Sequence, residues 1–239
     1  MQDSNRFILF AMFILIVVLA VIFLLTPSTD SHPAFKRASI ENVLVIDPGH
    51  GGEDGGAVTR DGVKESEINL QIALRMAEIC DFCGIPYKMT RTSEEINYPE
   101  ELKSTAKRKR YDQDKRLDLI ESVENAVLIS IHQNKFTSSS PRGPQAFFSA
   151  NDGSKELAIL VQEKMNTVLY PQNRRIAVQI PDSIYLMNSL DCVAVLAECG
   201  FLSNPVEGAA LREDGYQSKV ALCLVSSYCV FCDSRQRYL

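Results

Sequence analysis

Three short runs along the chain are apolar at almost every position and rich in β-branched residues, at residues 43–47, 127–131 and 193–197. Such runs are typical of strands covered on both faces, as in a parallel sheet, whereas a half-exposed strand alternates apolar and polar residues. Residues 87–90 are a further candidate strand, because the segment Gly84-Ile85-Pro86 before them ends a helical pattern. The chain is therefore predicted to contain a central sheet.

Between these runs, apolar residues recur at the three- and four-residue spacing of amphipathic helices. Stripes of this kind occupy residues 68–83 and 157–169, and a shorter one occupies residues 220–228. Strands that alternate with helices indicate an α/β fold. We expect a single domain with a mainly parallel central sheet flanked by helices on both faces. Residues 91–112 show no apolar periodicity and are predicted to form a long loop.

The N-terminal region differs from the rest of the chain, since residues 7–25 contain no charged side chain. A run of about 18 or more apolar residues can cross a membrane as a helix, and it exceeds the roughly 7–15 apolar residues of a cleavable signal peptide. We therefore expect a short tail at 1–6, a transmembrane signal anchor at 7–26, a linker at 27–41 and a folded domain at 42–239. The domain is expected outside the cytoplasm, attached to the membrane, or secreted if the apolar segment is cleaved.

The overall charge argues against one class of partner. The chain has 25 Lys and Arg against 30 Asp and Glu, a formal net charge of −5, which offers no support for nucleic-acid binding. A local basic run nevertheless lies at residues 103–110. It is predicted to be a solvated loop or helix face, with contact to an anionic polymer or to lipid headgroups as the alternative.

Seven cysteines are many for a chain of 239 residues. Four of them form two Cys-x-x-Cys pairs, Cys80 with Cys83 and Cys229 with Cys232, which could bind a structural metal if the pairs met in space. Both pairs, however, fall near the ends of predicted helices, where positions i and i+3 share a face. Buried free thiols are therefore favoured over disulfides and over a metal site.

A residue capable of chemistry follows each of the three main apolar runs. The first run leads into His50, the second ends at His132 and the third ends at Glu198. Ligands of open α/β sheets bind outside the carboxyl ends of the strands. If these strands are parallel neighbours, the three side chains converge on one crevice.

The histidines favour a metal site in that crevice. Only three occur in the chain, and the remaining one, His32, lies in the predicted linker. Two imidazoles and one carboxylate are a common ligand set for catalytic zinc, with a fourth position open for water. The carboxylate candidates are Glu53, Asp54, Glu65, Glu67 and Glu198. Glu65 and Glu67 both open the predicted helix, where the helix dipole favours any acidic residue, so the pattern does not separate them.

Four segments together resemble a known family. They read DPGHGGEDGGAV, GVKESEINL, SIHQN and AECGFLSNP along the chain. Their order resembles that of the zinc-dependent N-acetylmuramoyl-L-alanine amidases, whose fold is a mixed or mainly parallel sheet flanked by helices. The resemblance implies one zinc ion per chain, held by His50, Glu65 and His132. It also assigns the catalytic acid/base to Glu198 and selects Glu65 over Glu67.

Within that family, the chain is most similar to the CwlD-type, germination-specific amidases. The resemblance implies cleavage of the amide bond between the lactyl group of N-acetylmuramic acid and L-alanine in peptidoglycan, during spore cortex maturation or germination. The alternatives are a vegetative cell-wall autolysin and a catalytically silent wall-binding or assembly protein of the same fold. The chain departs from the usual motif at Gln133, where a small residue is usual, and this change is expected to alter the pocket wall.

Three further residues are predicted to support the site. Asp47 and Asn134 are expected to orient the ligand histidines, with Asn134 also a candidate for substrate contact. Arg116 is a candidate for binding substrate carboxylates through its planar guanidinium. The alternatives are that Asp47 only ends its strand and that Arg116 is a surface charge. Cys199 neighbours the catalytic carboxylate, but side chains alternate along a strand, so it should point away from the crevice.

The expected partners are a peptidoglycan glycan strand with its stem peptide, the membrane through residues 7–26, and an accessory protein of unknown identity. Nucleic acid is not expected. A dinucleotide-binding site is also disfavoured, because Asp54 stands where the pattern Gly-x-Gly-x-x-Gly requires its third glycine.

Overall fold

The structure is a computed structural model that describes residues 42–59 and 61–236. Its strands are β1 (Val43–Pro48), β2 (Tyr87–Met89), β3 (Ala126–Asn134), β4 (Gln145–Phe148), β5 (Val178–Gln179) and β6 (Val193–Phe201). Its helices are α2 (Glu65–Cys83), α3 (Thr105–Glu121), α4 (Ser154–Val168), α5 (Tyr185–Asn188), α6 (Pro205–Ala210) and α7 (Asp214–Gln236). The predicted tail, anchor and linker lie outside the described residues. Among the helices that are described, none is both long and apolar enough to span a bilayer.

The six strands form one mixed sheet in the order β2-β1-β3-β6-β4-β5. β1 pairs in parallel with β2 and β3, and β3 pairs in parallel with β6. β4 runs antiparallel to β6, and β5 is parallel to β4. The predicted α/β domain is confirmed, including the strand after the first long helix. The antiparallel step at β4 was not expected.

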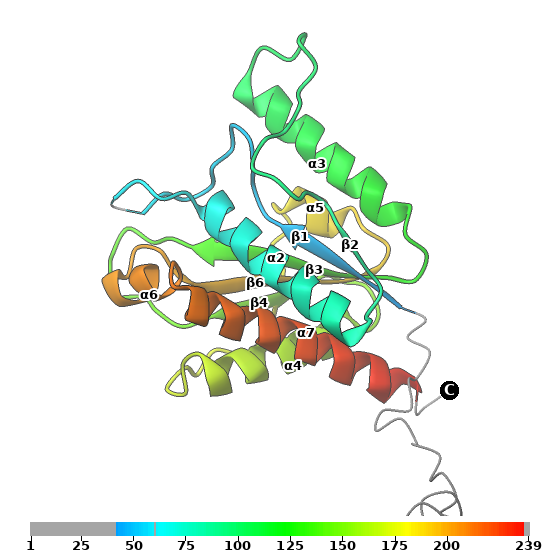
Figure 1. Cartoon of the computed structure of the whole chain (residues 1–239), viewed down its shortest axis with the longest axis vertical. Coiled ribbons are helices and arrows are strands. Elements are labelled where there is room, and N and C mark those ends of the chain that lie inside the picture. Colours follow the sequence, from blue (N-terminus) through cyan, green and yellow to red (C-terminus); the bar gives the residue numbers. More distant parts are fainter. Residues whose placement is uncertain (1–41, 60, 237–239) are drawn as a thin grey trace, which may run out of the picture. The chain divides into compact units, whose positions relative to one another are not determined.

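Helices cover both faces of the sheet (Figure 1). α2, α4 and α7 pack on one face over a core that includes Leu44, Ile129 and Val195. α3 and α5 lie on the other face, over a smaller core that includes Val45 and Leu128. Successive side chains of a strand point to opposite faces. The central strands are therefore buried on both sides, which explains why their sequences do not alternate.

The predicted helical stripes correspond to α2, α4 and α7, and the end of α2 is well defined. Gly84 follows the helix with φ 65° and ψ 35°, the left-handed conformation that glycine adopts without steric cost. Its backbone N–H donates to the carbonyl of Asp81. The chain then turns directly into β2, which places residues 90–91 beside the end of β1.

The prediction of a loop over residues 91–112 is wrong in its C-terminal part, because α3 begins at Thr105. Ser104 caps this helix by accepting a hydrogen bond from the backbone N–H of Lys107. Only Arg116 and Ile120 of α3 are buried. Without an apolar stripe, the helix left no periodic pattern in the sequence.

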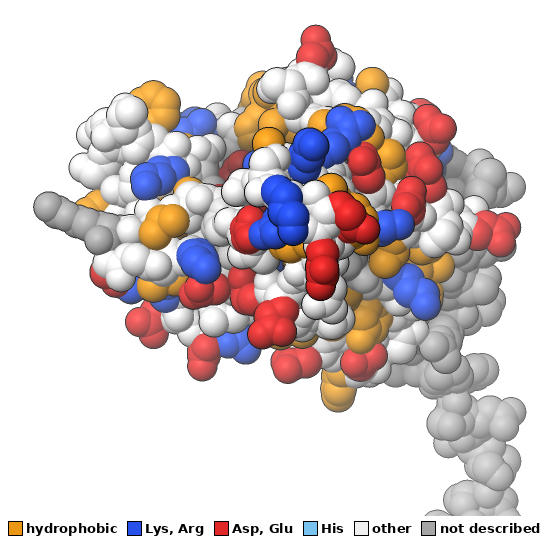
Figure 2. All heavy atoms as spheres, turned by 90° about the horizontal axis from the view of Figure 1, so that it is seen from above, with side chains coloured by type: hydrophobic (Ala, Val, Ile, Leu, Met, Phe, Trp, Pro, Cys, Tyr) orange, Lys and Arg blue, Asp and Glu red, His pale blue; other side chains and the backbone are white. Residues whose placement is uncertain are grey.

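The basic run at the start of α3 is a solvated helix face, on which Lys and Arg side chains gather among acidic ones (Figure 2). Three of its cations form ion pairs, Arg108 with Glu53, Lys109 with Asp54 and Arg110 with Asp114. Lys109 and Arg108 thereby connect α3 to the loop that follows β1.

All seven cysteines lie in the described part of the chain and are free thiols. Cys80, Cys199, Cys223 and Cys232 are buried. Burial raises the pKa of Cys80 to about 12 and that of Cys223 to about 11, so these thiols stay neutral and pack as small apolar groups. Within the described residues, no three cysteines come close enough together to hold a metal ion.

Candidate active site

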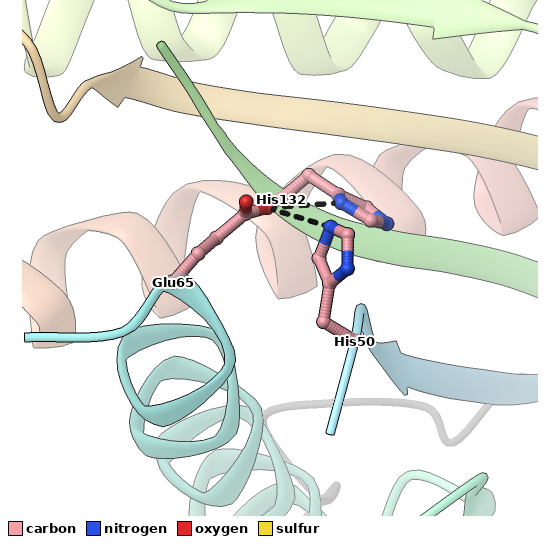
Figure 3. A group of neighbouring side chains, drawn as sticks. All are labelled: His50, Glu65 and His132. Carbon is pink, nitrogen blue, oxygen red and sulfur yellow. Dashed lines mark hydrogen bonds and ion pairs between the residues drawn. The ribbon is translucent and has the colours of Figure 1, made fainter. Parts of the chain in front are cut away.

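The ends of β1 and β3 and the start of α2 bring His50, Glu65 and His132 together (Figure 3). One ligand atom from each residue lies within 4.8 Å of those of the other two. Oε1 of Glu65 is 3.0 Å from Nδ1 of His132 and 3.4 Å from Nε2 of His50. Glu67 lies apart from this group and lines a different hollow. The structure thus separates the two glutamates that the sequence pattern left equivalent.

Glu198 lies in the same cleft, which has a volume of about 610 Å³. It occupies the position opposite His132 in the β3–β6 ladder. Its Oε2 atom is shielded from solvent and has no hydrogen-bond partner among the described residues. Burial, aided by the negative charge of Glu65 and opposed by His132, raises the pKa of Glu198 to about 7. A carboxyl group with such a pKa can both accept and release a proton near neutral pH.

Two carboxylates hold His50 from opposite sides. Its Nδ1 donates to Oδ2 of Asp54 at 3.0 Å, and its Nε2 faces Glu65. Burial alone would lower the pKa of His50, but Asp54 and Glu65 outweigh burial and raise it to about 9. Burial would likewise raise the pKa of Glu65, but the two histidines hold it well below its usual range. The group therefore favours a positive charge at its centre.

This arrangement fits a divalent metal ion. Two imidazole nitrogens and one carboxylate are a zinc ligand set that leaves a position open. Asp54 orients His50 in the way that carboxylates orient histidine ligands in metal sites. The carboxylate of Glu65 is fixed by backbone N–H groups, since Ala57 donates to Oε2 at 2.8 Å and Gln133 donates to Oε1 at 3.0 Å.

The turn after β1 is closely packed against the ligands. His50 has φ 61°, a left-handed conformation that is uncommon for a residue other than glycine. A Cβ atom at Gly49 would collide with the ring of His132. Gly56, with φ 66°, leaves room for the carboxylate of Glu65 in the same way. The glycines of the first motif therefore permit the backbone to approach the ligand side chains.

Two buried arginines support this turn. Arg116 donates to the carbonyl oxygens of Pro48 and His50, at 2.7 and 2.5 Å. Arg91 donates through Nε to the same two carbonyls, at 3.0 and 2.7 Å. The strained turn thus has its buried carbonyl groups satisfied from two directions.

Arg116 is buried and has several partners within the protein. It is only 4% exposed, and its guanidinium also bonds Asp47 at 2.7 Å and Asp112 at 2.9 Å. These contacts leave it little capacity to bind substrate carboxylates. Arg116 is therefore not a surface charge, and its hydrogen bonds support the turn that carries His50. It also lines the cleft, where its contact with substrate carboxylates stays a prediction.

Asp47 also has different contacts from those expected. It accepts hydrogen bonds from the hydroxyls of Thr90 and Ser130, each at 2.6 Å, in addition to the pair with Arg116. Within residues 42–59 and 61–236 it hydrogen-bonds no histidine ring, and Asp54 is the carboxylate that contacts Nδ1 of His50. Asn134 is half-buried and lines the cleft, where its contact with substrate stays a prediction.

Two residues beside the catalytic groups point to the α2 face of the sheet. Cys199 is 0% exposed in the core beneath α2 and α7, as strand alternation predicted. Gln133 is 3% exposed, and its side-chain amide donates to Asn69 of α2 at 3.1 Å. Gln133 also lines the cleft, so this unusual glutamine contacts both α2 and the cleft.

The sequence interpretation missed Asn69 and Arg91, which are both polar and buried. Asn69 follows Glu65 by one helical turn, so its position on the ligand face of α2 was available from spacing. Arg91 lies just beyond β2, in a segment without periodicity, and no sequence signal marked it.

Two histidines and a glutamate that could hold a metal ion lie beside a shielded carboxyl group at one edge of the sheet, an arrangement that suits a hydrolase of α/β fold. The family model for N-acetylmuramoyl-L-alanine amidase matches residues 44–227. The chain belongs to the N-acetylmuramoyl-L-alanine amidase family and is an enzyme of that type. The resemblance drawn from the four motifs is thereby confirmed.

Individual relatives support the same assignment. The chain is 34% identical over 195 residues to the germination-specific N-acetylmuramoyl-L-alanine amidase of Bacillus subtilis strain 168. The match covers 81% of this chain and 81% of that amidase. It is 26% identical over 201 residues to the amidase LytC of that organism, covering 82% of this chain and 37% of LytC. A solved structure of the CwlD amidase from Clostridioides difficile, in complex with the GerS lipoprotein, has a TM-score of 0.77. Its identity is 32%, and the match covers 81% of this chain and 99% of CwlD.

Proposed function

We propose that this chain is a zinc-dependent hydrolase that cleaves the amide bond between the lactyl group of N-acetylmuramic acid and L-alanine in peptidoglycan. The observation that carries the proposal is the convergence of His50, Glu65 and His132 beside Glu198 in one cleft. The first three residues would hold the ion. When bound, zinc supplies a Lewis acid that polarises the scissile carbonyl and lowers the pKa of water.

Glu198 moves the proton in this proposal. As a carboxylate it accepts a proton from the attacking water, and as an acid it returns that proton to the nitrogen of the departing alanine. Its Oε2 atom has no competing partner among the described residues. Its pKa of about 7 keeps the acid and the carboxylate close in free energy, so the same group can serve both transfers.

The walls of the cleft suit a substrate that is part sugar and part peptide. The half-buried ring of Tyr185, at the start of α5, and the exposed side chain of Ile184 before it line one side, an apolar and aromatic wall against which a sugar ring can pack. Lys109 and Lys135 line the cleft as well and are exposed to solvent. The charge of Lys135 favours binding of the carboxylates of a stem peptide, whereas Lys109 is paired with Asp54. Asn134 adds a neutral hydrogen-bonding group to the cleft.

The proposal extends to the biological setting. The similarity to the germination-specific amidase supports a role in spore cortex maturation or germination. The similar CwlD amidase forms a complex with the GerS lipoprotein, which supports an accessory lipoprotein as partner of this chain. The apolar segment at 7–26 supports attachment to the membrane, with the catalytic domain outside the cytoplasm.

Mass analysis of digested cell wall tests the proposal. The zinc-loaded full-length chain is incubated with purified spore cortex and, separately, with vegetative peptidoglycan, with a His132→Ala variant as the inactive control. The expected products are peptide-free muramic acid residues and peptides that begin with a free L-alanine amine. Equal digestion of both walls would favour a vegetative autolysin. Binding to the wall without release of either product would contradict the amidase assignment.

A further inference from the structure

Two buried amides, Asn69 and Gln133, connect the three segments that carry the metal-binding group. Asn69 is 0% exposed and Gln133 is 3% exposed. Nε2 of Gln133 donates to Oδ1 of Asn69 at 3.1 Å. Nδ2 of Asn69 in turn donates to the carbonyl oxygen of Gly49 at 3.1 Å. One side-chain pair thus joins β3, α2 and the turn after β1.

Each of these contacts falls on a ligand or on a residue next to one. Gly49 directly precedes the first histidine, and Gln133 directly follows the second. Nδ2 of Asn69 also lies 3.4 Å from Oε1 of Glu65, one turn earlier on α2. The backbone N–H of Gln133 donates to the same oxygen at 3.0 Å. A shift of either amide would therefore move more than one ligand.

We propose that the Asn69–Gln133 pair sets the mutual spacing of the three ligands and so determines how tightly and in what geometry the metal binds. The proposal rests on the proposed function, since it presumes a metal held by those ligands. Groups that fix ligand orientation commonly change metal affinity by about 10- to 100-fold when they are removed. Gln133 also lines the cleft, but its side-chain amide donates to Asn69 of α2, so the pair can act on the metal through the ligands.

Fold stability alone does not account for this pair. A buried amide is costly unless all its hydrogen bonds are made, and Oε1 of Gln133 has no hydrogen-bond partner among the described residues. An apolar side chain would fill the same space without that cost. The two amides provide directional hydrogen bonds. Asn69 accepts one from Gln133 of β3, and it donates toward the carbonyl of Gly49 and the carboxylate of Glu65.

The test compares zinc affinity in three variants of the full-length chain. Gln133→Met and Asn69→Leu remove the amides and keep a similar volume. Gln217→Met is the matched control, because Gln217 is 0% exposed and bonds Gln71 of α2 at 2.6 Å, without contacting a ligand-bearing residue. Zinc dissociation constants are measured by competition with a chromophoric chelator, and the visible spectrum of the Co²⁺-substituted protein reports ligand geometry.

We expect zinc to bind about 10- to 100-fold more weakly to both test variants, with changed Co²⁺ bands, and the control to stay within about twofold of wild type. Gln133→Met decides the matter if Asn69→Leu does not fold. Unchanged affinity and spectrum in folded Gln133→Met would overturn the inference, as would an equal loss in the control. A wild-type chain that binds no zinc would instead overturn the proposed function.

Discussion

His132 and Glu198 face each other in the parallel ladder of β3 and β6, so the two side chains project from the same face of the sheet. Adjacent strands lie about 4.8 Å apart. The distance between a proposed ligand and the proposed proton carrier is therefore fixed by backbone hydrogen bonds. The ladder changes register immediately after this pair, between His132 and Asn134, an irregularity of the kind that β-bulges produce beside active sites.

Replacement of Glu198 by glutamine should abolish most of the activity without removing the metal. Glutamine keeps the shape but cannot accept the proton, so kcat should fall by about 10²- to 10⁴-fold. Release of peptide from purified peptidoglycan is measured at matched zinc content. Glu67→Gln, a neighbouring carboxylate outside the ligand group, is the control and should retain near-normal rates. Comparable rates for Glu198→Gln and wild type would contradict the assigned role.

The activity should also depend on pH through Glu198. Burial raises its pKa from 4.5 to about 7, and a bound divalent cation nearby opposes this shift because it favours the carboxylate. The free enzyme needs the carboxylate form, so kcat/KM should rise with pH through a single limb between those two values. A pH profile of kcat/KM measures this rise. The residual activity of Glu198→Gln should not show the same rise with pH. A wild-type profile that is flat from pH 4 to 8 would exclude this group as the base.

The sequence predicted those residues of the site that lie at the ends of strands. His50, His132 and Glu198 each follow a buried apolar run, so parallel pairing of those runs was enough to bring them together. α3 could not be predicted in the same way, since it rests on the sheet mainly through Ile120 and the buried Arg116. Its position depends on ion pairs between distant segments, which leave no periodic trace.

The positions of buried polar residues could not be predicted from the sequence either. Arg91 satisfies the carbonyls of a strained turn, a requirement that exists only once the turn has formed. β4 was missed because four residues that begin with a glutamine carry too short a pattern to distinguish a strand from a loop.

Loss of Arg116 should destabilise the fold. It is paired with the buried Asp47, and removal of one member of a buried pair typically costs about 3–5 kcal/mol because the remaining charge is uncompensated. Arg116→Met should therefore lower the free energy of unfolding in urea by that amount at pH 7. Arg110→Met, which breaks an exposed pair on the same helix, should cost less than about 1 kcal/mol. Similar losses for the two variants would show that burial of the pair carries no special weight.

The same pair should give the fold a defined acid sensitivity. Burial would raise the pKa of Asp47, but Arg116 and the hydroxyls of Ser130 and Thr90 outweigh it and lower the pKa from 3.8 to about 2. A depressed pKa stabilises the fold fully above the unfolded-state value and loses that contribution as pH falls through the folded-state value. The stability advantage of wild type over Asp47→Asn should thus shrink between about pH 5 and pH 2. Urea unfolding across that range measures it, and an advantage independent of pH would contradict the ionised pair.

Removal of the metal should abolish activity reversibly and lower thermal stability. The three ligands bind the ion only when folded together, so the ion stabilises the native state by about 2.7 kcal/mol at a concentration 100 times its dissociation constant. Treatment with a chelator should reduce both the Tm and peptide release, and added zinc should restore them. A His50→Ala variant should show no Tm increase with zinc. Activity that survives exhaustive chelation would exclude a metal-dependent reaction.

Gly49→Ala should damage the site through a single added methyl group. A Cβ atom at this position would meet the ring of His132, so either the ring or the turn must move. A displacement of about 1 Å in a catalytic constellation can cost roughly 100-fold in rate. We expect weaker zinc binding and a kcat/KM reduced at least tenfold.

Gly215→Ala is the control, because nothing lies within 4 Å of a Cβ there and alanine favours the α7 helix. Parallel assays of zinc affinity, peptide release and Tm separate local displacement from loss of the fold. Wild-type zinc affinity in Gly49→Ala would show that the turn accommodates the methyl group without moving the ligand.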